Sequence, residues 1–291
     1  MKKGLLIAGL CLLALGFGLS WVGRAMGGAT EAEARIFGHS IQVRCGDMFV
    51  SIGVSSDRAE TVSGGSEAAA ENESAPAGPA VVQKKLEAFT EVEVDLELGN
   101  VIIQTGETYG MELDWWGDGY TLDYLLHDDG TLEIWSESSA LRGLSMSDCG
   151  ARVVITVPEE AELEDLTVYA DLGDVELDGI AVQTAELTLD LGSLTGRGVT
   201  VSRSADVEAD LGDVELSGDL RGKTVVNASL GSVSLDLEGA ESEYCYDLSV
   251  DLGKLTVNGR DFESEVSGGR GDDSLEVYAD LGDVNVTFSD S

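Results

Sequence analysis

The chain has 291 residues and a formal net charge of −38 at pH 7, because 55 Asp and Glu outnumber 17 Lys and Arg. A polyanion of this kind does not bind phosphate backbones by counterion release, which excludes nucleic acids, and anionic lipid headgroups repel its folded part. The only histidines are His39 and His127, so imidazole catalysis and histidine-rich metal sites are not expected. Partners should be cationic, neutral like a glycan, or bridged by divalent cations.

The first expected element is a transmembrane signal-anchor over residues 1–24. Residues 4–23 carry no charge and as a helix would span about 30 Å, the thickness of a hydrocarbon core. Lys2 and Lys3 precede this stretch, which predicts a cytoplasmic N-terminus and an extracytoplasmic C-terminal domain in the cell membrane. A cleavable secretory signal is the alternative, with a shorter apolar region of about 7–15 residues. The length favours the retained anchor.

Three further regions follow this anchor. Residues 25–54 read as a short membrane-proximal β segment, with two strands around Cys45-Gly46-Asp47. Residues 55–82 are small and polar, which is typical of a flexible linker. Residues 83–291 alternate apolar and polar side chains, as in Val153, Ile155 and Val157, with a hairpin signal at Asp129-Gly130. This last region is expected to be all-β.

The four cysteines do not form a redox motif. Cys11 lies in the apolar segment, and Cys45, Cys149 and Cys245 form no CxxC pair and allow at most one disulfide. Isolated small apolar residues are the simpler interpretation.

A motif around Leu-Gly recurs through the last region. It reads DLGDVEL at 171–177 and 210–216, DLGSLTG at 190–196 and DLGDVNV at 280–286, and ELGNVII at 97–103 is an earlier copy. The repeated glycines are Gly173, Gly192, Gly212, Gly231, Gly253 and Gly282. Their steps are near twenty residues except for the last, which predicts a single-stranded β-solenoid, β-helix-like, with rungs of roughly 20 residues.

Within each repeat, the glycine is expected to form a corner between two strands. Before the glycine, the apolar residues Val168, Ala170 and Leu172 occupy even-numbered positions, and after it Val175 and Leu177 occupy odd-numbered ones. In one straight strand these two sets would face opposite sides. A glycine with positive φ can bend the chain so that both sets face the same side. Two columns should therefore be buried: one is Leu172, Leu191, Leu211, Leu230, Leu252 and Leu281, and the other is Val175, Leu194, Val214, Val233, Leu255 and Val284.

The pairs around DLG-[DS]-[VL], preceded by VVITVPEEAELEDLTV, resemble the bacterial putative-adhesin family of β-strand-repeat envelope proteins, a domain of unknown function. The resemblance covers residues 86–291. It implies a place behind one N-terminal membrane segment in the cell envelope, in some members beside envelope-stress signalling, and it implies no catalytic residues. The last long step and the irregular stretch from Thr105 to Cys149 depart from a uniform repeat.

Two short motifs are candidate contact sites. In Asp114-Trp115-Trp116-Gly117, adjacent residues of a strand face opposite sides, so one Trp should be exposed. Trp115 and Trp116 could then stack on a sugar or protein partner, or cap the open end of the solenoid. The Arg270-Gly271-Asp272 tripeptide resembles the integrin-recognition sequence, but a chance occurrence is the favoured interpretation, because the chain is long and rich in Gly and Asp.

The residue before each repeated leucine forms an acidic column. It contains Asp171, Asp190, Asp210, Ser229, Asp251 and Asp280. Stacked carboxylates repel one another, and two interactions could offset this: calcium bridging Asp171, Asp190 and Asp210, or an Asx-turn from each Asp to the N–H of the corner glycine. Ser229 favours the turn, because serine can cap but is a poor calcium ligand. No cofactor is required.

Taken together, these patterns predict a non-enzymatic, adhesin-like binding module of the bacterial cell envelope that meets an envelope protein or a glycan. The alternative is an accessory protein of envelope-stress signalling that contacts a membrane partner. A polysaccharide-acting enzyme is the third interpretation. It is disfavoured because acidic sugars require a groove with basic residues, and only 17 Lys and Arg are spread over the whole chain.

Overall fold

The computed structural model describes residues 30–36, 39–46, 49–56, 80–117, 119–138 and 149–289. The chain divides into two compact units, residues 1–70 and 71–291. The expected membrane helix at 1–24 lies outside the described residues, as does most of the linker. Within the described ranges, no helix is long and apolar enough to cross a membrane.

The first unit contains a three-stranded antiparallel sheet. Its strands are β1 (Thr30–Ile36), β2 (His39–Gly46) and β3 (Phe49–Ser56), paired in that order. The strand β2 includes Cys45 and ends at Gly46, and β3 begins at Phe49, after two residues that lie outside the described ranges. The strand β1 was not predicted, because its sequence TEAEARI combines three charged residues with two alanines, types that are depleted in strands.

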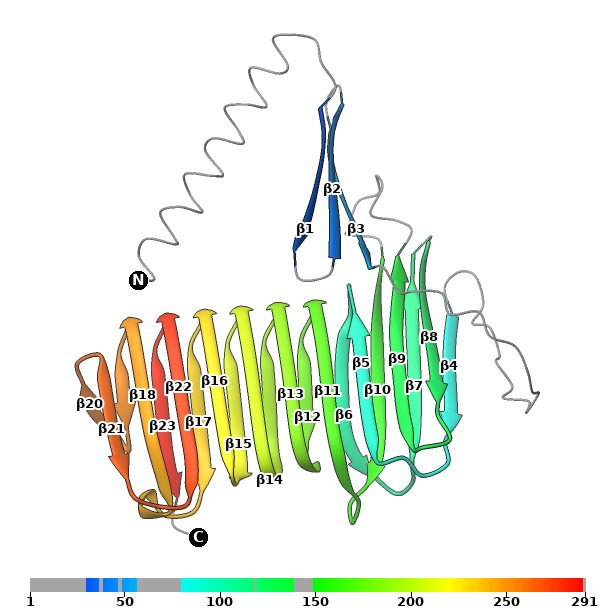
Figure 1. The fold of residues 1–291 in the computed structure, drawn as a ribbon. Coiled ribbons are helices and arrows are strands. Elements are labelled where there is room, and N and C mark those ends of the chain that lie inside the picture. Colours follow the sequence, from blue (N-terminus) through cyan, green and yellow to red (C-terminus); the bar gives the residue numbers. More distant parts are fainter. Residues whose placement is uncertain are drawn as a thin grey trace. The chain divides into compact units, whose positions relative to one another are not determined.

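The second unit is all-β and contains one 20-stranded sheet that folds over into two facing layers, face A and face B (Figure 1). Face A contains, in spatial order, β8 (Tyr120–Leu126), β9 (Thr131–Ser138), β5 (Glu91–Leu96), β11 (Glu162–Leu172), β13 (Ala181–Leu191), the second half of β14 (Leu194–Leu211), β16 (Lys223–Leu230), β22 (Asp273–Leu281), β18 (Tyr244–Leu252) and β21 (Glu265–Gly269). Face B contains β4 (Ala80–Lys85), β7 (Gly110–Trp116), β10 (Gly150–Pro158), β6 (Asn100–Gly106), β12 (Val175–Asp178), the first half of β14, β15 (Val214–Leu220), β17 (Val233–Glu238), β23 (Val284–Ser289), β19 (Leu255–Val257) and β20 (Arg260–Phe262).

Each turn of the chain places one strand on face A and the next on face B, and turns that are neighbours in space pair in parallel. These turns are the rungs of a solenoid, which confirms the all-β solenoid part of the predicted fold class. Side chains alternate between buried and exposed along the strands: in β12, Val175 and Leu177 are buried, whereas Glu176 and Asp178 are exposed. The buried side chains from both faces form one core. A 3-10 turn, η2 (Glu241–Glu243), connects β17 to β18.

The rungs at both ends are stacked out of sequence order. The last rung of the chain, β22 and β23, lies between β16/β17 and β18/β19, and Figure 1 shows these red strands inside yellow and orange neighbours. At the other end, β5 and β6 lie between β11/β12 and the strands β9 and β10. The last two rungs are therefore not stacked in the order of the sequence. Antiparallel hairpins close the ends, including the predicted Asp129-Gly130 turn between β8 and β9.

The corner glycines adopt the geometry that the repeat predicts. The six have φ between +151° and +158°. At Gly212, an added Cβ would lie 1.8 Å from the carbonyl oxygen of Gly192 in the neighbouring rung. Glycine is needed here for close approach of two backbones as well as for its φ. The column headed by Val175 is fully buried, as expected.

The second unit has a complete structure of its own. Its strands begin at Ala80, so the first three residues of β4 fall inside the predicted 55–82 linker. The strands β4 to β23 pair only with one another, and the described hydrophobic core lies entirely within this unit. Fragment 71–291 therefore contains all the described strands of the solenoid and the whole described core.

Candidate functional site

The leucine column before the corner glycines lies outside the core, which corrects the sequence prediction. Leu191, Leu211, Leu230 and Leu281 are 43–45% exposed, and Leu252 is 67% exposed. Inward-facing residues are instead the one two positions earlier, such as Leu189, and the one three positions later, such as Leu194. The chain bends over the four residues between them, so the alternation is interrupted before the leucine rather than after it.

These leucines are in register along one edge of the solenoid. The pairs are Leu172 with Leu191, Leu191 with Leu211, Leu211 with Leu230, Leu230 with Leu281, and Leu281 with Leu252. Neighbouring strands are about 4.8 Å apart, so the six side chains form a row about 24 Å long. We call this row, Leu172, Leu191, Leu211, Leu230, Leu281 and Leu252, the leucine ridge.

The backbone carbonyl groups of the ridge leucines accept hydrogen bonds from the corner glycines of neighbouring rungs. Gly192 donates its N–H to the carbonyl oxygen of Leu211 at 2.9 Å, and Gly212 donates to Leu230 in the same way. The prediction of an Asx-turn was therefore wrong: the glycine N–H that the preceding Asp was expected to cap already donates to the next rung. The leucine carbonyls are thus engaged between rungs, while the leucine side chains are exposed.

Side-chain capping does occur, but one residue after the glycine. Ser193 donates its N–H to Oδ1 of Asp174 at 2.9 Å, Asp213 donates to Oγ of Ser193 at 3.3 Å, and Ser232 donates to Oδ1 of Asp213 at 2.8 Å. The full spatial order of this capping ladder is Asn100, Asp174, Ser193, Asp213, Ser232, Asp283 and Lys254. In this order charged and neutral side chains alternate until the final Asp283–Lys254 pair, which keeps like charges two rungs apart.

The acidic column on the face A side of the ridge lacks such alternation. Desolvation against neighbouring rungs raises the pKa of Asp171, and the carboxylates of Asp190 and Asp95 raise it further. Desolvation also raises the pKa of Asp190, with Asp210 adding to the shift. Ser229 relieves the column at the next rung, where its Oγ donates to Oδ1 of Asp210 at 3.3 Å. Among the described residues, no group of three or more His, Cys, Asp or Glu has an arrangement that could hold a metal ion.

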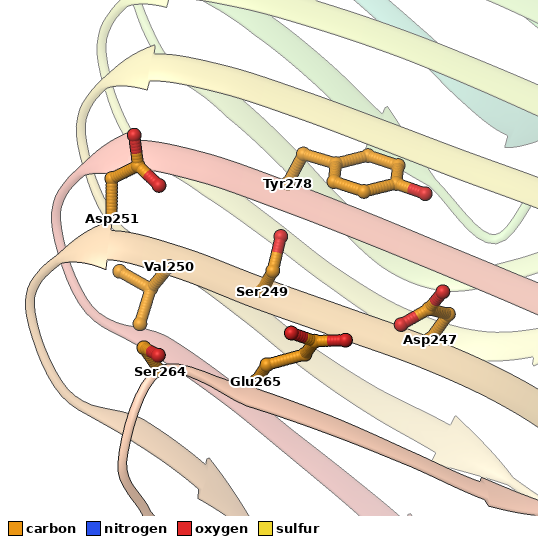
Figure 2. A pocket seen from close by; sticks show the side chains of 7 residues that line it. All are labelled: Asp247, Ser249, Val250, Asp251, Ser264, Glu265 and Tyr278. Carbon is orange, nitrogen blue, oxygen red and sulfur yellow. The ribbon is translucent and has the colours of Figure 1, made fainter.

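At the Leu252 end of the ridge, face A is hollowed. The hollow has a volume of about 410 Å³ and is lined by Asp247, Ser249, Val250, Asp251, Ser264, Glu265 and Tyr278. Figure 2 shows Asp251 at the bend of β18, with Glu265 on the adjacent strand and Tyr278 on β22. Three carboxylates and no basic residue line the hollow, so it favours a cationic group.

The two tryptophans lie on β7 near the other end of the solenoid and face opposite sides, as predicted. Trp115 is 1% exposed and belongs to the core. Trp116 is 44% exposed and lies against Gly150, whose added Cβ would be 2.9 Å from the indole ring. The buried Trp115 has no surface to offer a ligand, whereas a cap role for it and ligand binding by Trp116 both stay predictions.

The remaining motifs do not join the ridge. Arg270 and Asp272 are exposed between β21 and β22. Cys149 and Cys245 are free thiols, and the side chain of Cys45 lies outside the described residues. His127 lies with Nε2 3.0 Å from a carboxylate oxygen of Glu133, which makes a local ion pair when protonated.

Sequence reasoning missed the leucine ridge, although a signal was present. The buried column after the corner accepts both Val and Leu, whereas the ridge column contains leucine in every repeat. Two apolar residues three positions apart, such as Leu172 and Val175, cannot both continue one alternating strand. The repeat predicts this break at the glycine, whereas in the structure the alternation already ends at the leucine: Asp190 and Leu191 are both exposed, although β13 runs to Leu191.

Several solved structures are similar to the chain. One is a putative cell adhesion protein from Clostridium sporogenes, 15% identical, covering 72% of this chain and 100% of its own, with a TM-score of 0.46. Another is a putative adhesin from Bacteroides fragilis, 13% identical, covering 72% and 97%, with a TM-score of 0.38. A putative lipid binding protein from Parabacteroides distasonis is 12% identical, covers 75% and 96%, and has a TM-score of 0.32.

No curated protein matches the chain. A family model, Toastrack DUF4097, matches residues 89–291, which include every rung and the whole leucine ridge. The repeated corners and the parallel stacking described above lie within this match. The chain therefore belongs to the Toastrack DUF4097 family.

Proposed function

We propose that the protein is a non-enzymatic binding module of the bacterial cell envelope, anchored by its N-terminal segment, and that the leucine ridge is its contact surface. The observation that carries this proposal is the exposure of Leu191, Leu211, Leu230, Leu281 and Leu252 in one continuous row. A row of exposed leucines keeps apolar area in contact with water, which is unfavourable by about 25 cal/mol per Å² until a partner covers it.

The architecture supports a binding role over a catalytic one. The repeated polar residues at the corners, such as Ser193 and Asp213, are engaged in the capping ladder, which stabilises the edge. A rigid edge presents its side chains at fixed spacing, which favours recognition of an extended surface. The ridge is the feature of this edge that packing within the chain does not explain.

The experiment that tests the proposal is site-specific photo-crosslinking in cells that express the full chain. In one variant, a photoreactive residue replaces Leu211 on the ridge. In the matched control it replaces Arg197, which is exposed on face B, at the end of its strand segment that lies away from the ridge. We expect a discrete adduct from position 211 that disappears when Leu191→Ser and Leu230→Ser are added, and no adduct from position 197. No adduct from 211, or an equal one from 197, would contradict the proposal.

The membrane placement is tested separately. The proposed topology puts the solenoid outside the cytoplasmic membrane, with Lys2 and Lys3 inside. Protease added to wall-stripped cells should release the chain beyond about residue 55, where the small polar linker begins. A solenoid that survives in intact protoplasts but is digested after lysis would reverse the orientation.

A further inference from the structure

We infer that the partner of the leucine ridge is a basic amphipathic helix, with one apolar stripe bordered on both sides by Lys or Arg. This inference rests on the proposed function, because it names the chemistry of the partner at the same surface. It is carried by the charges that flank the ridge, by the spacing of the leucines, and by the hydrogen bonds already made at the corners.

Carboxylates border the ridge on both sides. On the face A side, the exposed acidic residues are Asp171, Asp190, Asp210, Asp280 and Asp251. On the face B side, they are Asp174, Asp213 and Asp283, with Lys254 at the end already paired with Asp261 at 2.8 Å. An apolar stripe between two acidic borders is complementary to an apolar stripe between two basic borders.

The spacing of the ridge fits a helix better than a strand. Neighbouring leucines are about 4.8 Å apart, whereas one helical turn rises about 5.4 Å and same-side residues of a strand repeat at about 6.7 Å. A helix that covers the row of about 24 Å needs about 16 residues. Strand addition is also disfavoured, because corner N–H groups such as those of Gly192 and Gly212 already have acceptors.

The same charges argue against other occupants. If two copies docked ridge to ridge, the acidic borders that contain Asp190 and Asp213 would face the same borders of the second copy. Like charges across an interface are unfavourable. An anionic membrane surface would be repelled for the same reason. A cationic helix replaces this repulsion with attraction while it covers the leucines.

The hollow at the Leu252 end gives the helix a preferred position. Its carboxylates Asp247, Asp251 and Glu265 surround a space of about 410 Å³ that can receive a Lys or Arg side chain. Asp251 belongs both to the hollow and to the border of the ridge, so one basic residue of the helix can reach the hollow while its neighbours stay on the leucines (Figure 2).

The test uses fragment 71–291 and synthetic peptides of about 18 residues. The probe peptide contains only Leu and Lys in a helical period. One control has the same composition in strict alternation, and another replaces every Lys by Glu. Binding is followed by calorimetry from about 0.05 M to about 0.5 M NaCl. We expect the helical Leu/Lys peptide to bind at least about tenfold more tightly than either control, with affinity falling as salt rises.

Two variants separate the ridge from general attraction to a polyanion. Leu191→Ser, Leu211→Ser and Leu230→Ser together leave the net charge unchanged, and we expect about a tenfold loss of affinity. Asp190→Asn, Asp210→Asn and Asp280→Asn together should lose about as much. The matched control, Glu176→Gln, Glu215→Gln and Asp236→Asn, removes three exposed charges from face B and should bind like the unmodified fragment.

The inference would be overturned if the triple aspartate variant and the face B control lost the same amount of peptide affinity. Unchanged peptide binding by the triple serine variant would also overturn it. Ridge-dependent binding to phosphatidylcholine vesicles would assign the ridge to a lipid surface instead. Self-association of the fragment that the triple serine variant abolishes would assign it to a second copy. Crosslinking at Leu211 in cells without peptide binding would refute the helix and leave the proposed function standing. If the triple serine variant does not fold, the peptide affinities of the single variant Leu211→Ser and of the triple aspartate variant test the inference instead.

Discussion

Gly231 donates its backbone N–H to the carbonyl oxygen of Leu281 at 2.9 Å, although the two residues are 50 positions apart in the sequence. The same bond joins rungs that are adjacent in sequence, such as Gly192 to Leu211. The final rung therefore fits between two earlier ones without any change in corner geometry. One corner design serves both sequential and inserted rungs, and it keeps the leucine ridge continuous past the insertion.

The corner glycines should tolerate no side chain, because neighbouring backbones leave no space. Gly212→Ala places a Cβ 1.8 Å from the carbonyl oxygen of Gly192, so we expect a loss of about 3 kcal/mol in the free energy of unfolding. Gly259→Ala is the control: its φ of +71° is also positive, but nothing lies within 4 Å of an added Cβ. It should lose only about 1–2 kcal/mol. Urea denaturation of fragment 71–291 measures both, and equal losses would mean that φ alone matters.

The capping ladder should depend on an acceptor and not on a charge. Asp213→Ala leaves the N–H of Ser232 without its 2.8 Å partner, and we expect a loss of about 0.5–1.5 kcal/mol. Asp213→Ser removes the same charge but keeps an oxygen acceptor, as Ser193 does for the neighbouring rung, and should stay close to the unmodified fragment. Thermal melting compares the two, and a similar loss in both would assign the role to the carboxylate.

The acidic column should destabilise the solenoid at neutral pH. The pKa of Asp190 is raised in the folded state, so stability falls as pH rises from its ordinary value of 3.8 through the raised folded value, and the full penalty remains above it. Asp190→Asn removes this penalty. We expect a higher melting temperature for the variant at pH 7 and a difference that narrows towards pH 4. A lower melting temperature at pH 7 would mean that the carboxylate makes a stabilising contact.

Calcium should act on this column only as a salt. Sodium chloride and calcium chloride at equal ionic strength should raise the melting temperature of fragment 71–291 by similar amounts, because general screening relieves the repulsion among Asp171, Asp190 and Asp210. The contrary result is a rise at micromolar calcium that sodium does not reproduce and that Asp190→Ser abolishes. That result would establish a calcium site along the column.

The repeat predicted the fold because each copy carries the residues that one corner needs. Glycine at the bend and Val or Leu at the buried position, as in Gly212 and Val214, determine a rung locally. The order of the rungs could not be predicted from these letters, since VYADLGDV at 168–175 and 277–284 is identical and fits any neighbour. The inserted last rung depends on long-range pairing, and only the 29-residue final step indicated an irregularity.

The candidate site was harder to predict than the fold. The alternation of Val168, Ala170 and Leu172 predicts that Leu172 lies in the core. In the structure the alternation ends before the corner, and the leucine column lies outside the core. Likewise, the N–H of Gly173 has two possible acceptors in the sequence, Asp171 or the next rung, and only the stacked structure shows that it donates to Leu191 at 2.9 Å. Contacts between rungs, which determine both outcomes, are not encoded within one repeat.

The central claim is that the ridge leucines serve contact with a partner rather than packing within the chain. The most direct measurement compares Leu191→Ala with Leu194→Ala in fragment 71–291 by urea denaturation. The two residues share a rung and are three positions apart, but Leu191 is 45% exposed and Leu194 is 0% exposed. We predict a loss of about 2–5 kcal/mol for Leu194→Ala and less than about 1 kcal/mol for Leu191→Ala. Equal losses would place Leu191 in the core and contradict the existence of the ridge.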